Sequence, residues 1–214
     1  MGNGMTKIID GLYLGNYHDS KDREQLSRNN ITHIVSIHDY PKPELADMKY
    51  LCLNASDCSS QDLTRYFKDC VKFIHECRLK GGGCLVHCMA GISRSTTVVL
   101  VYLMTVTELG FADTLAAVRT VRTHACPNCG FQEQLQHFER YSLKDMRLWL
   151  RLEFGHNPFN DHIAVGALLI SSARAIRHDT SRVGTRSASR QSRSHDPKLI
   201  FFIFWAQGMD NGTD

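Results

Sequence analysis

The sequence lacks any long apolar run. No stretch approaches the ~18 consecutive apolar residues that a membrane-spanning helix needs. The first ten residues, MGNGMTKIID, also lack the apolar core of a secretory signal. The eight cysteines show no paired spacing of the kind that indicates a disulfide framework. We therefore expect a protein that stays inside the cell, where cysteines are kept as thiols.

Charge is distributed unevenly along the 214 residues, which are enough for one ordinary domain and an appendage. Residues 1–173 are formally neutral. Residues 174–214 hold seven of the 25 Lys and Arg but only four of the 22 Asp and Glu, which accounts for the whole net charge of +3. We expect a folded domain over residues 1–160. A disordered tail rich in Arg and Ser is predicted over residues 161–214, with a short apolar segment, LIFFIFWA, near its end.

Alternation of apolar and polar residues predicts several strands in the first half of the chain. The β-branched stretch at residues 31–38 and the segment KYLCLN at residues 49–54 are both predicted to be strands. CLV, at residues 84–86, supplies a short buried strand, and GLYLGN, at residues 11–16, predicts a short edge strand with a turn.

Helical periodicity accounts for most of the remaining chain. Helices are expected within residues 20–30, 62–83, 95–110, 112–122 and 131–151. The first should begin at an N-cap formed by Asp19 or Ser20. The helix at 95–110 is apolar on nearly every face and should lie at the centre of the domain. Strands that alternate with helices indicate a layered α/β fold.

The stretch LVHCMAGISRS, residues 85–95, places a thiol in a glycine-containing loop between a strand and a buried helix. Amides of such a loop can all point inward, at the positive end of the helix dipole, and so form an anion site. Gly91 permits the tight turn, and Arg94 adds a charged fork that matches two phosphate oxygens. This positive field favours the thiolate of Cys88, which predicts a nucleophile for phosphoryl transfer. A buried cysteine is often inert packing, but packing alone does not explain this convergence.

The segment HCMAGISRS resembles the signature loop of the cysteine-dependent protein phosphatases, and specifically of their dual-specificity branch. The resemblance covers roughly residues 4–160 and includes GLYLGN, ITHIVSIHD, NASD and PNCGFQEQL. It is greatest to the small atypical members, a group with a JNK pathway-associated phosphatase and a myristoylated sibling. The resemblance implies a protein tyrosine phosphatase-like α/β fold, with a central mixed β-sheet flanked by helices.

The activity that the resemblance implies is hydrolysis of phosphotyrosine and phosphoserine or phosphothreonine in signalling proteins, through a phosphocysteine. It implies that Cys88 is the nucleophile and that Arg94 binds the phosphoryl group. Asp57 would be the general acid, with Asp39 and Asp62 as the alternatives, and Ser95 would hydrogen-bond the thiolate. No metal and no other cofactor is expected.

Further residues would support the phosphate site by the same resemblance. His87 would hold the shape of the loop without transferring protons, and Asn128 would brace the loop from a neighbouring turn. The residues expected to line the bound phosphate are Met89, Ala90, Gly91, Ile92, Ser93 and Arg94.

Three alternatives compete for the same residues. Cys126 and Cys129 have the spacing of half a zinc site, with His124 close by, but no second pair exists to complete four ligands. A catalytically weak module that binds phosphoproteins or acts as a scaffold is a second alternative. A polyphosphoinositide or RNA phosphatase is the third, although the loop carries none of the extra cations that such substrates favour.

A disulfide between Cys84 and Cys88 is not expected. The two residues are separated by ~13 Å of strand, which is too far for the bond.

The N-terminus MGNGMT fits the N-myristoylation pattern, with Gly2 as the acceptor. We expect phosphorylated proteins, including kinases of the MAP kinase pathways, as partners, and no nucleic acid. The protein is predicted to be a monomer in the cytoplasm, with peripheral attachment to the inner face of the plasma membrane and the nucleus as an alternative location. One myristoyl chain holds a membrane only marginally, so stable attachment would need a second signal. The basic tail could supply it through anionic lipid, but we favour an unfolded end without a membrane role.

Overall fold

Five strands form one mixed sheet in the computed structural model, which describes residues 4–171. The order across the sheet is β1 (Thr6–Ile9), β2 (Leu12–Gly15), β5 (Gly83–His87), β3 (Ile31–His38) and β4 (Lys49–Asn54). β1 and β2 are antiparallel, whereas all other neighbours are parallel. The carboxyl ends of the parallel strands therefore meet at one edge of the sheet, which is where ligands bind in such folds.

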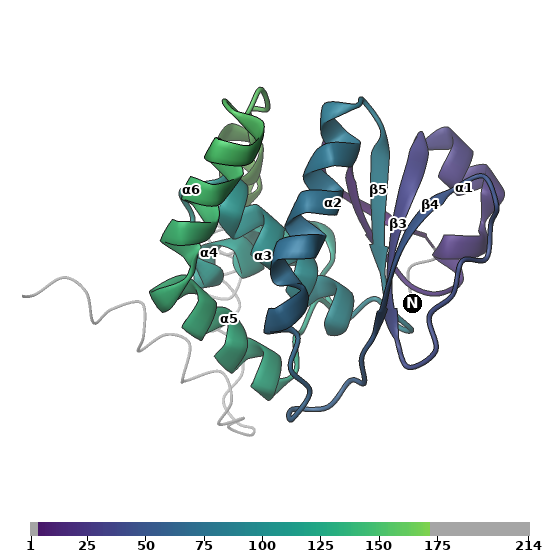
Figure 1. Cartoon of the computed structure of the whole chain (residues 1–214), viewed down its shortest axis with the longest axis horizontal. Coiled ribbons are helices and arrows are strands. Elements are labelled where there is room, and N and C mark those ends of the chain that lie inside the picture. The colour runs from purple at the N-terminus through teal and green to yellow at the C-terminus, as the bar shows by residue number, and fades with distance from the viewer. Residues whose placement is uncertain (1–3, 172–214) are drawn as a thin grey trace, which may run out of the picture. The chain divides into compact units, whose positions relative to one another are not determined.

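Helices cover both faces of this sheet (Figure 1). α1 (Arg23–Arg28) lies on one face, where its Leu26 belongs to a buried cluster with Ile34 of β3 and Leu85 of β5. The other face carries α2 (Phe67–Leu79), α3 (Arg94–Val106), α4 (Phe111–Val121), α5 (Cys129–Tyr141) and α6 (Leu143–Phe154). This arrangement confirms the predicted mixed sheet flanked by helices. Within residues 4–171, no helix combines the length and apolarity needed to cross a bilayer.

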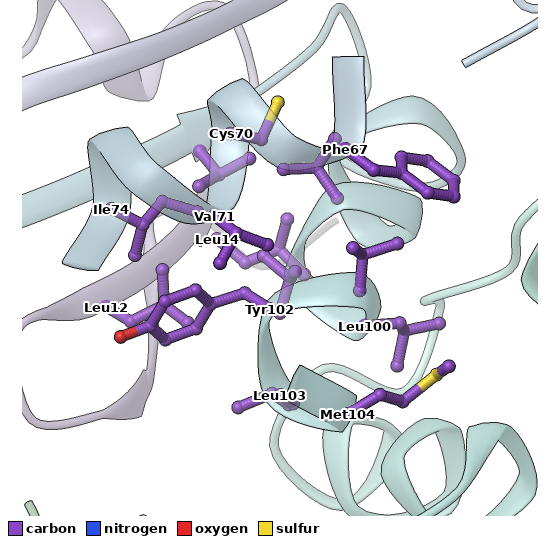
Figure 2. Close-up of a cluster of buried hydrophobic side chains, with 14 of the residues drawn as sticks. Leu12, Leu14, Phe67, Cys70, Val71, Ile74, Leu100, Tyr102, Leu103 and Met104 are labelled. Atoms are coloured by element: carbon purple, nitrogen blue, oxygen red, sulfur yellow. The ribbon is translucent and has the colours of Figure 1, made fainter. Parts of the chain in front are cut away.

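The larger core forms around α3, in which every residue from Arg94 to Thr105 is buried. Figure 2 shows side chains of α3, such as Leu100 and Tyr102, beside Val71 of α2 and Leu14 of β2. α3 is therefore enclosed by neighbouring elements, as its nearly uniform apolarity predicts. A buried helix of this kind gives the loop that precedes it a rigid support.

Two strand and helix predictions near the N-terminus are wrong in detail. β2 lies inside the sheet between β1 and β5, so GLYLGN is not an edge strand. The N-cap of α1 is Asp22, whose carboxylate accepts a hydrogen bond from the amide of Gln25 at 3.0 Å. Asp19 and Ser20 belong instead to a preceding 3-10 turn, where both are buried.

The single helix predicted at residues 131–151 is also wrong, because α5 and α6 are separated at Ser142. Ser142 leaves helical geometry with φ −125° and ψ −18°, while its amide still bonds the carbonyl of Phe138. The break gives α6 a direction of its own, in which Leu143 and Leu150 are buried in the core. Apolar periodicity alone does not reveal such a change of direction.

The folded unit extends past the boundary predicted at residue 160. A helical segment begins at Asp161 and continues to residue 171, the last described. Asp161 is 3% exposed and forms hydrogen bonds of 2.7 and 2.8 Å with the guanidinium of Arg78. The buried ion pair explains why this segment belongs to the domain. The predicted tail from residue 172 onward and the acceptor Gly2 lie outside the described residues.

Candidate active site

A short loop joins the end of β5 to the start of α3, as the sequence predicts. β5 ends at His87 and α3 begins at Arg94. Gly91 adopts a φ of +68°, and a Cβ there would clash with the backbone of Gly15. Only glycine fits this turn, because the conformation and the close approach both exclude a side chain.

The sulfur of Cys88 lies at the bottom of this loop, with the residue only 1% exposed. The amide of Gly91 and the hydroxyl of Ser95 each donate a hydrogen bond to it over 3.2 Å. Burial opposes ionisation of the thiol, but the bonds from the Ser95 side chain and the amides of Ser95, Ile92 and Gly91 outweigh it and lower the pKa of Cys88. The site therefore favours a thiolate without exposing it to water.

Arg94, the first residue of α3, is held by groups that directly follow two strands. Its Nη1 donates to the carbonyl of Ala55 at 3.0 Å and to the carboxylate of Asp39 at 3.3 Å. Its Nε is buried and has no hydrogen-bond partner within residues 4–171. A buried unpaired donor is costly, so this edge of the guanidinium is suited to an oxyanion that arrives from solution.

Asp57 is bound to the loop through a small hydrogen-bond network. Its Oδ1 accepts from the hydroxyl of Ser93 at 2.7 Å and from Nδ2 of Asn128 at 2.8 Å. Its Oδ2 is 3.8 Å from Nε of Arg94, and the side chain is 35% exposed. Asn128 also caps α5, since its Oδ1 accepts from the amide of Phe131. The structure therefore places Asn128 against both the loop and Asp57.

His87 is buried directly before the cysteine. Its Nδ1 lies 3.4 Å from the carbonyl oxygen of Cys88, which fits an N–H that donates to the backbone. Burial lowers the pKa of His87 to about 4, so the imidazole is neutral near pH 7. A neutral, buried ring suits the predicted structural role.

The structure brings Cys88, Arg94, Asp57 and Ser95 together, whereas Asp62 bonds its own loop through the amide of Thr64. Sequence reasoning missed several residues that brace the site: Tyr17, Asp39 as a partner of Arg94, Ala55 and Arg122. They come from separate segments, and no local motif distinguishes them.

The remaining cysteines include the pair considered for zinc. All eight cysteines lie in the described residues, and none forms a disulfide there. Cys126 and Cys129 are exposed. In the part of the chain that the structure describes, no three His, Cys, Asp or Glu side chains lie close enough together to hold a metal ion.

Comparison with known families agrees with a phosphate site of this kind. The model of the dual specificity phosphatase catalytic domain matches residues 12–141. The chain belongs to this family and is a dual-specificity protein phosphatase, whose substrates are phosphorylated proteins. Dual specificity protein phosphatase 22 of Xenopus tropicalis is 58% identical over 195 residues, which are 91% of this chain and 92% of that protein. Dual specificity protein phosphatase 15 of Rattus norvegicus is 54% identical, over 79% of this chain and 72% of that protein.

Solved structures show the same fold. The crystal structure of DUSP15 has a TM-score of 0.70 and 52% identity, and the match covers 73% of this chain and all of that one (100%). A human tyrosine phosphatase-like serine/threonine/tyrosine-interacting protein has a TM-score of 0.62 and 32% identity, over 66% of this chain and 99% of that one. The fold therefore also occurs in a protein whose description is phosphatase-like and names an interaction with serine, threonine and tyrosine.

Proposed function

We propose that the enzyme acts through a covalent phosphocysteine at Cys88. In the first step the thiolate attacks phosphorus, and the bond to the leaving oxygen of tyrosine, serine or threonine breaks. Asp57 gives its proton to that oxygen. Arg94 and the loop amides hold the three phosphoryl oxygens, where charge accumulates in the transition state.

The second step releases inorganic phosphate. Asp57, now a carboxylate, takes a proton from water, and the water oxygen attacks the phosphorus of the phosphocysteine. The S–P bond breaks and its electron pair returns to Cys88. The hydroxyl of Ser95 donates to the sulfur and so stabilises the thiolate as it leaves.

One arrangement supports this mechanism: Cys88, whose pKa is lowered by hydrogen bonds from the loop, lies in the loop that leads to Arg94. The buried Nε of Arg94 has no hydrogen-bond partner within the described residues and lies 3.8 Å from Oδ2 of Asp57. The test compares wild type, Cys88→Ser and the exposed-cysteine control Cys126→Ser on an aryl phosphate. Wild type and the control should release phosphate, and Cys88→Ser should release none while still binding tungstate. Hydrolysis by Cys88→Ser at the wild-type rate would assign another nucleophile.

The competing proposal is a module of the same fold that binds phosphoproteins without hydrolysing them. Its support is the structural similarity to a phosphatase-like interacting protein. Cys88, Arg94 and Asp57 are all in place for turnover here, which favours the enzyme. If the wild type binds a phosphopeptide but releases no phosphate from it, the binding module is the correct proposal.

The substrate class follows from the side chains around the loop. Met89 and Ala90 are exposed, neutral residues, and no cation lies among residues 89–93. A single dianionic phosphoryl group on a protein therefore fits better than a polyphosphoinositide or an RNA end. Within that class, regulatory kinases of the MAP kinase (JNK) pathway are the proposed targets, on the resemblance to the atypical branch.

Substrate trapping tests this target. Cys88→Ser should retain a phosphorylated kinase of this pathway from cell extract. The double variant Cys88→Ser/Arg94→Met should not retain this kinase, because it lacks the guanidinium that binds the phosphoryl oxygens. Equal retention by both variants would contradict recognition through the phosphoryl group.

The proposed location is the cytoplasm, with a myristoylated fraction at the inner face of the plasma membrane and the nucleus as the alternative. The support is the MGNGMT pattern, which offers Gly2 after removal of Met1. Coexpression with a myristoyltransferase should add one acyl group to wild type and none to Gly2→Ala, as read by intact mass. The acylated form should bind anionic vesicles weakly, and light scattering should give the mass of a monomer. Truncation of residues 174–214 decides whether the tail strengthens vesicle binding.

A further inference from the structure

The backbone of the phosphate loop is held from outside by three neighbours. A peptide unit is planar and trans, so each carbonyl that points outward turns the amide of the next residue inward. The three outward bonds are Tyr17 N to Met89 O at 3.3 Å, Arg122 Nε to Gly91 O at 2.9 Å and Cys126 N to Ile92 O at 2.9 Å. Arg122 is the one side chain among these three donors.

Arg122 follows the end of α4 and is only 3% exposed. Besides Gly91, its Nη1 donates to the hydroxyl of Thr6 at 3.0 Å and to the carbonyl of Leu14 at 3.2 Å. Its Nη2 also occupies the place that a Cβ on Gly91 would take. The guanidinium thus joins the loop to β1 and β2, behind the face that receives phosphate.

We propose that Arg122 is a positioning residue that fixes the peptide between Gly91 and Ile92 in the orientation that binds phosphate. Because its Nε holds the Gly91 carbonyl outward, the Ile92 amide must face the sulfur. That amide is one of the donors that lower the pKa of Cys88. Without Arg122, the peptide can rotate and present a carbonyl oxygen to an anionic substrate. This inference rests on the proposed catalytic role of Cys88.

A direct role in binding a second anion is the alternative, since Arg122 also borders a cavity of about 330 Å³ with Thr6 and His124. Two nitrogens of the guanidinium are already bonded to three oxygens of the protein, however, and these contacts favour positioning. The two roles predict different substrate dependence. A positioning residue acts on every phosphate ester, whereas an anion site acts only on substrates with a second phosphate.

The test uses the full chain with Arg122→Met, Arg122→Lys and Arg147→Met. Arg147 lies in α6 and donates to the carbonyls of Met104 and Leu109, so its variant controls for the loss of an arginine that bonds backbone away from the loop. The first measurement is the pH midpoint for alkylation of Cys88 by iodoacetamide, which needs no turnover. The second is kcat/KM on a singly phosphorylated aryl ester.

Arg122→Met should raise the alkylation midpoint by about one pH unit, a tenfold change in the ionisation constant, and lower kcat/KM at least tenfold. Arg122→Lys keeps the positive charge but lacks the planar guanidinium. Its alkylation midpoint and its kcat/KM should therefore lie between those of Arg122→Met and wild type. Arg147→Met should change neither. Full recovery by Arg122→Lys would assign the effect to charge and overturn positioning, as would a loss confined to doubly phosphorylated substrates.

Thr6→Val is the second variant, for the case that Arg122→Met does not fold. It removes the hydroxyl that accepts a hydrogen bond from the guanidinium and keeps a β-branched residue in β1. Relative to wild type, it should lower both the ionisation constant of Cys88 and kcat/KM about threefold, which corresponds to part of one hydrogen bond. No shift in either variant would overturn the inference. Failure of the proposed catalytic mechanism would look different, because the wild type itself would then release no phosphate.

Discussion

The hydroxyl of Ser93 donates a hydrogen bond of 2.7 Å to Oδ1 of Asp57, and this bond joins the phosphate loop to the proposed general acid. Nδ2 of Asn128 donates to the same oxygen at 2.8 Å. Since Oδ1 is occupied by two donors, Oδ2 is the oxygen that can carry a proton, and it lies toward Arg94. In the proposed mechanism, this network therefore selects Oδ2 as the oxygen that gives the proton.

Ser93→Ala should lower kcat about tenfold, because loss of one hydrogen bond to a charged group of about 1.5 kcal/mol frees the carboxylate to rotate. The loss should be shared with Asp57, so Ser93→Ala should add little once Asp57→Ala is present. A double-mutant cycle on phosphopeptide hydrolysis measures this coupling. Fully additive losses would mean that Ser93 acts independently of Asp57.

Asp57→Asn keeps the shape of the side chain but removes the transferable proton. Its effect should depend on the leaving group, because an alkoxide needs protonation far more than a nitrophenolate does. We expect a loss of about 10²–10⁴ in kcat on a phosphothreonine peptide and a much smaller loss on p-nitrophenyl phosphate. Asp62→Asn, which alters only a local turn, is the matched control. Equal losses on both substrates would move the acid role to another residue.

Ser95→Ala should raise the pKa of Cys88, because the hydroxyl stabilises the thiolate against the opposing effect of burial. Loss of a hydrogen bond to an ionised group corresponds to about one to two pH units. The pH midpoint of iodoacetamide alkylation should move upward by that amount, with the modified cysteine identified by peptide mass. Alkylation at pH 6 should therefore slow in the variant, and an unchanged midpoint would show that the amides alone hold the thiolate.

The parts of the site that lie in one continuous segment could be predicted from the sequence. Cys88, Gly91 and Arg94 are consecutive elements of one strand–loop–helix unit, and their chemistry follows from that order. Asp57 and Asn128 reach the site from other loops, so only the family resemblance pointed to them.

Two of the residues that no pattern revealed, Arg122 and Arg78, are buried charges whose partners are far away in the chain. Arg122 bonds Thr6, which is 116 positions away, and Arg78 bonds Asp161, 83 positions away. An isolated arginine in a sequence looks like a surface residue, because lone charges are rarely buried. The pair of Arg78 and Asp161 extends the domain beyond residue 160, and the contact of Arg122 with Thr6 supports the loop. Local composition contains no signal for either contact.

The buried pair of Arg78 and Asp161 predicts that the segment after residue 160 is needed for stability. Asp161→Ala leaves the guanidinium of Arg78 buried with only the carbonyl of Asp10 and the hydroxyl of Tyr102 as acceptors. The free energy of unfolding should fall by about 3 kcal/mol, the lower end of the cost of breaking a buried pair, because these acceptors remain. Urea unfolding measures the loss as a lower midpoint with an unchanged slope.

The matched control is Glu153→Ala, which removes an exposed ion pair with Lys72 whose side chains are 42% and 45% exposed. Such a pair contributes at most about 1 kcal/mol, so the control should unfold close to wild type. A chain that ends at residue 160 loses Asp161 and also the buried Val165, so it should be less stable than Asp161→Ala. If the truncated chain unfolds at the same urea concentration as the full chain, the ion pair contributes nothing to the fold and the domain does end at residue 160.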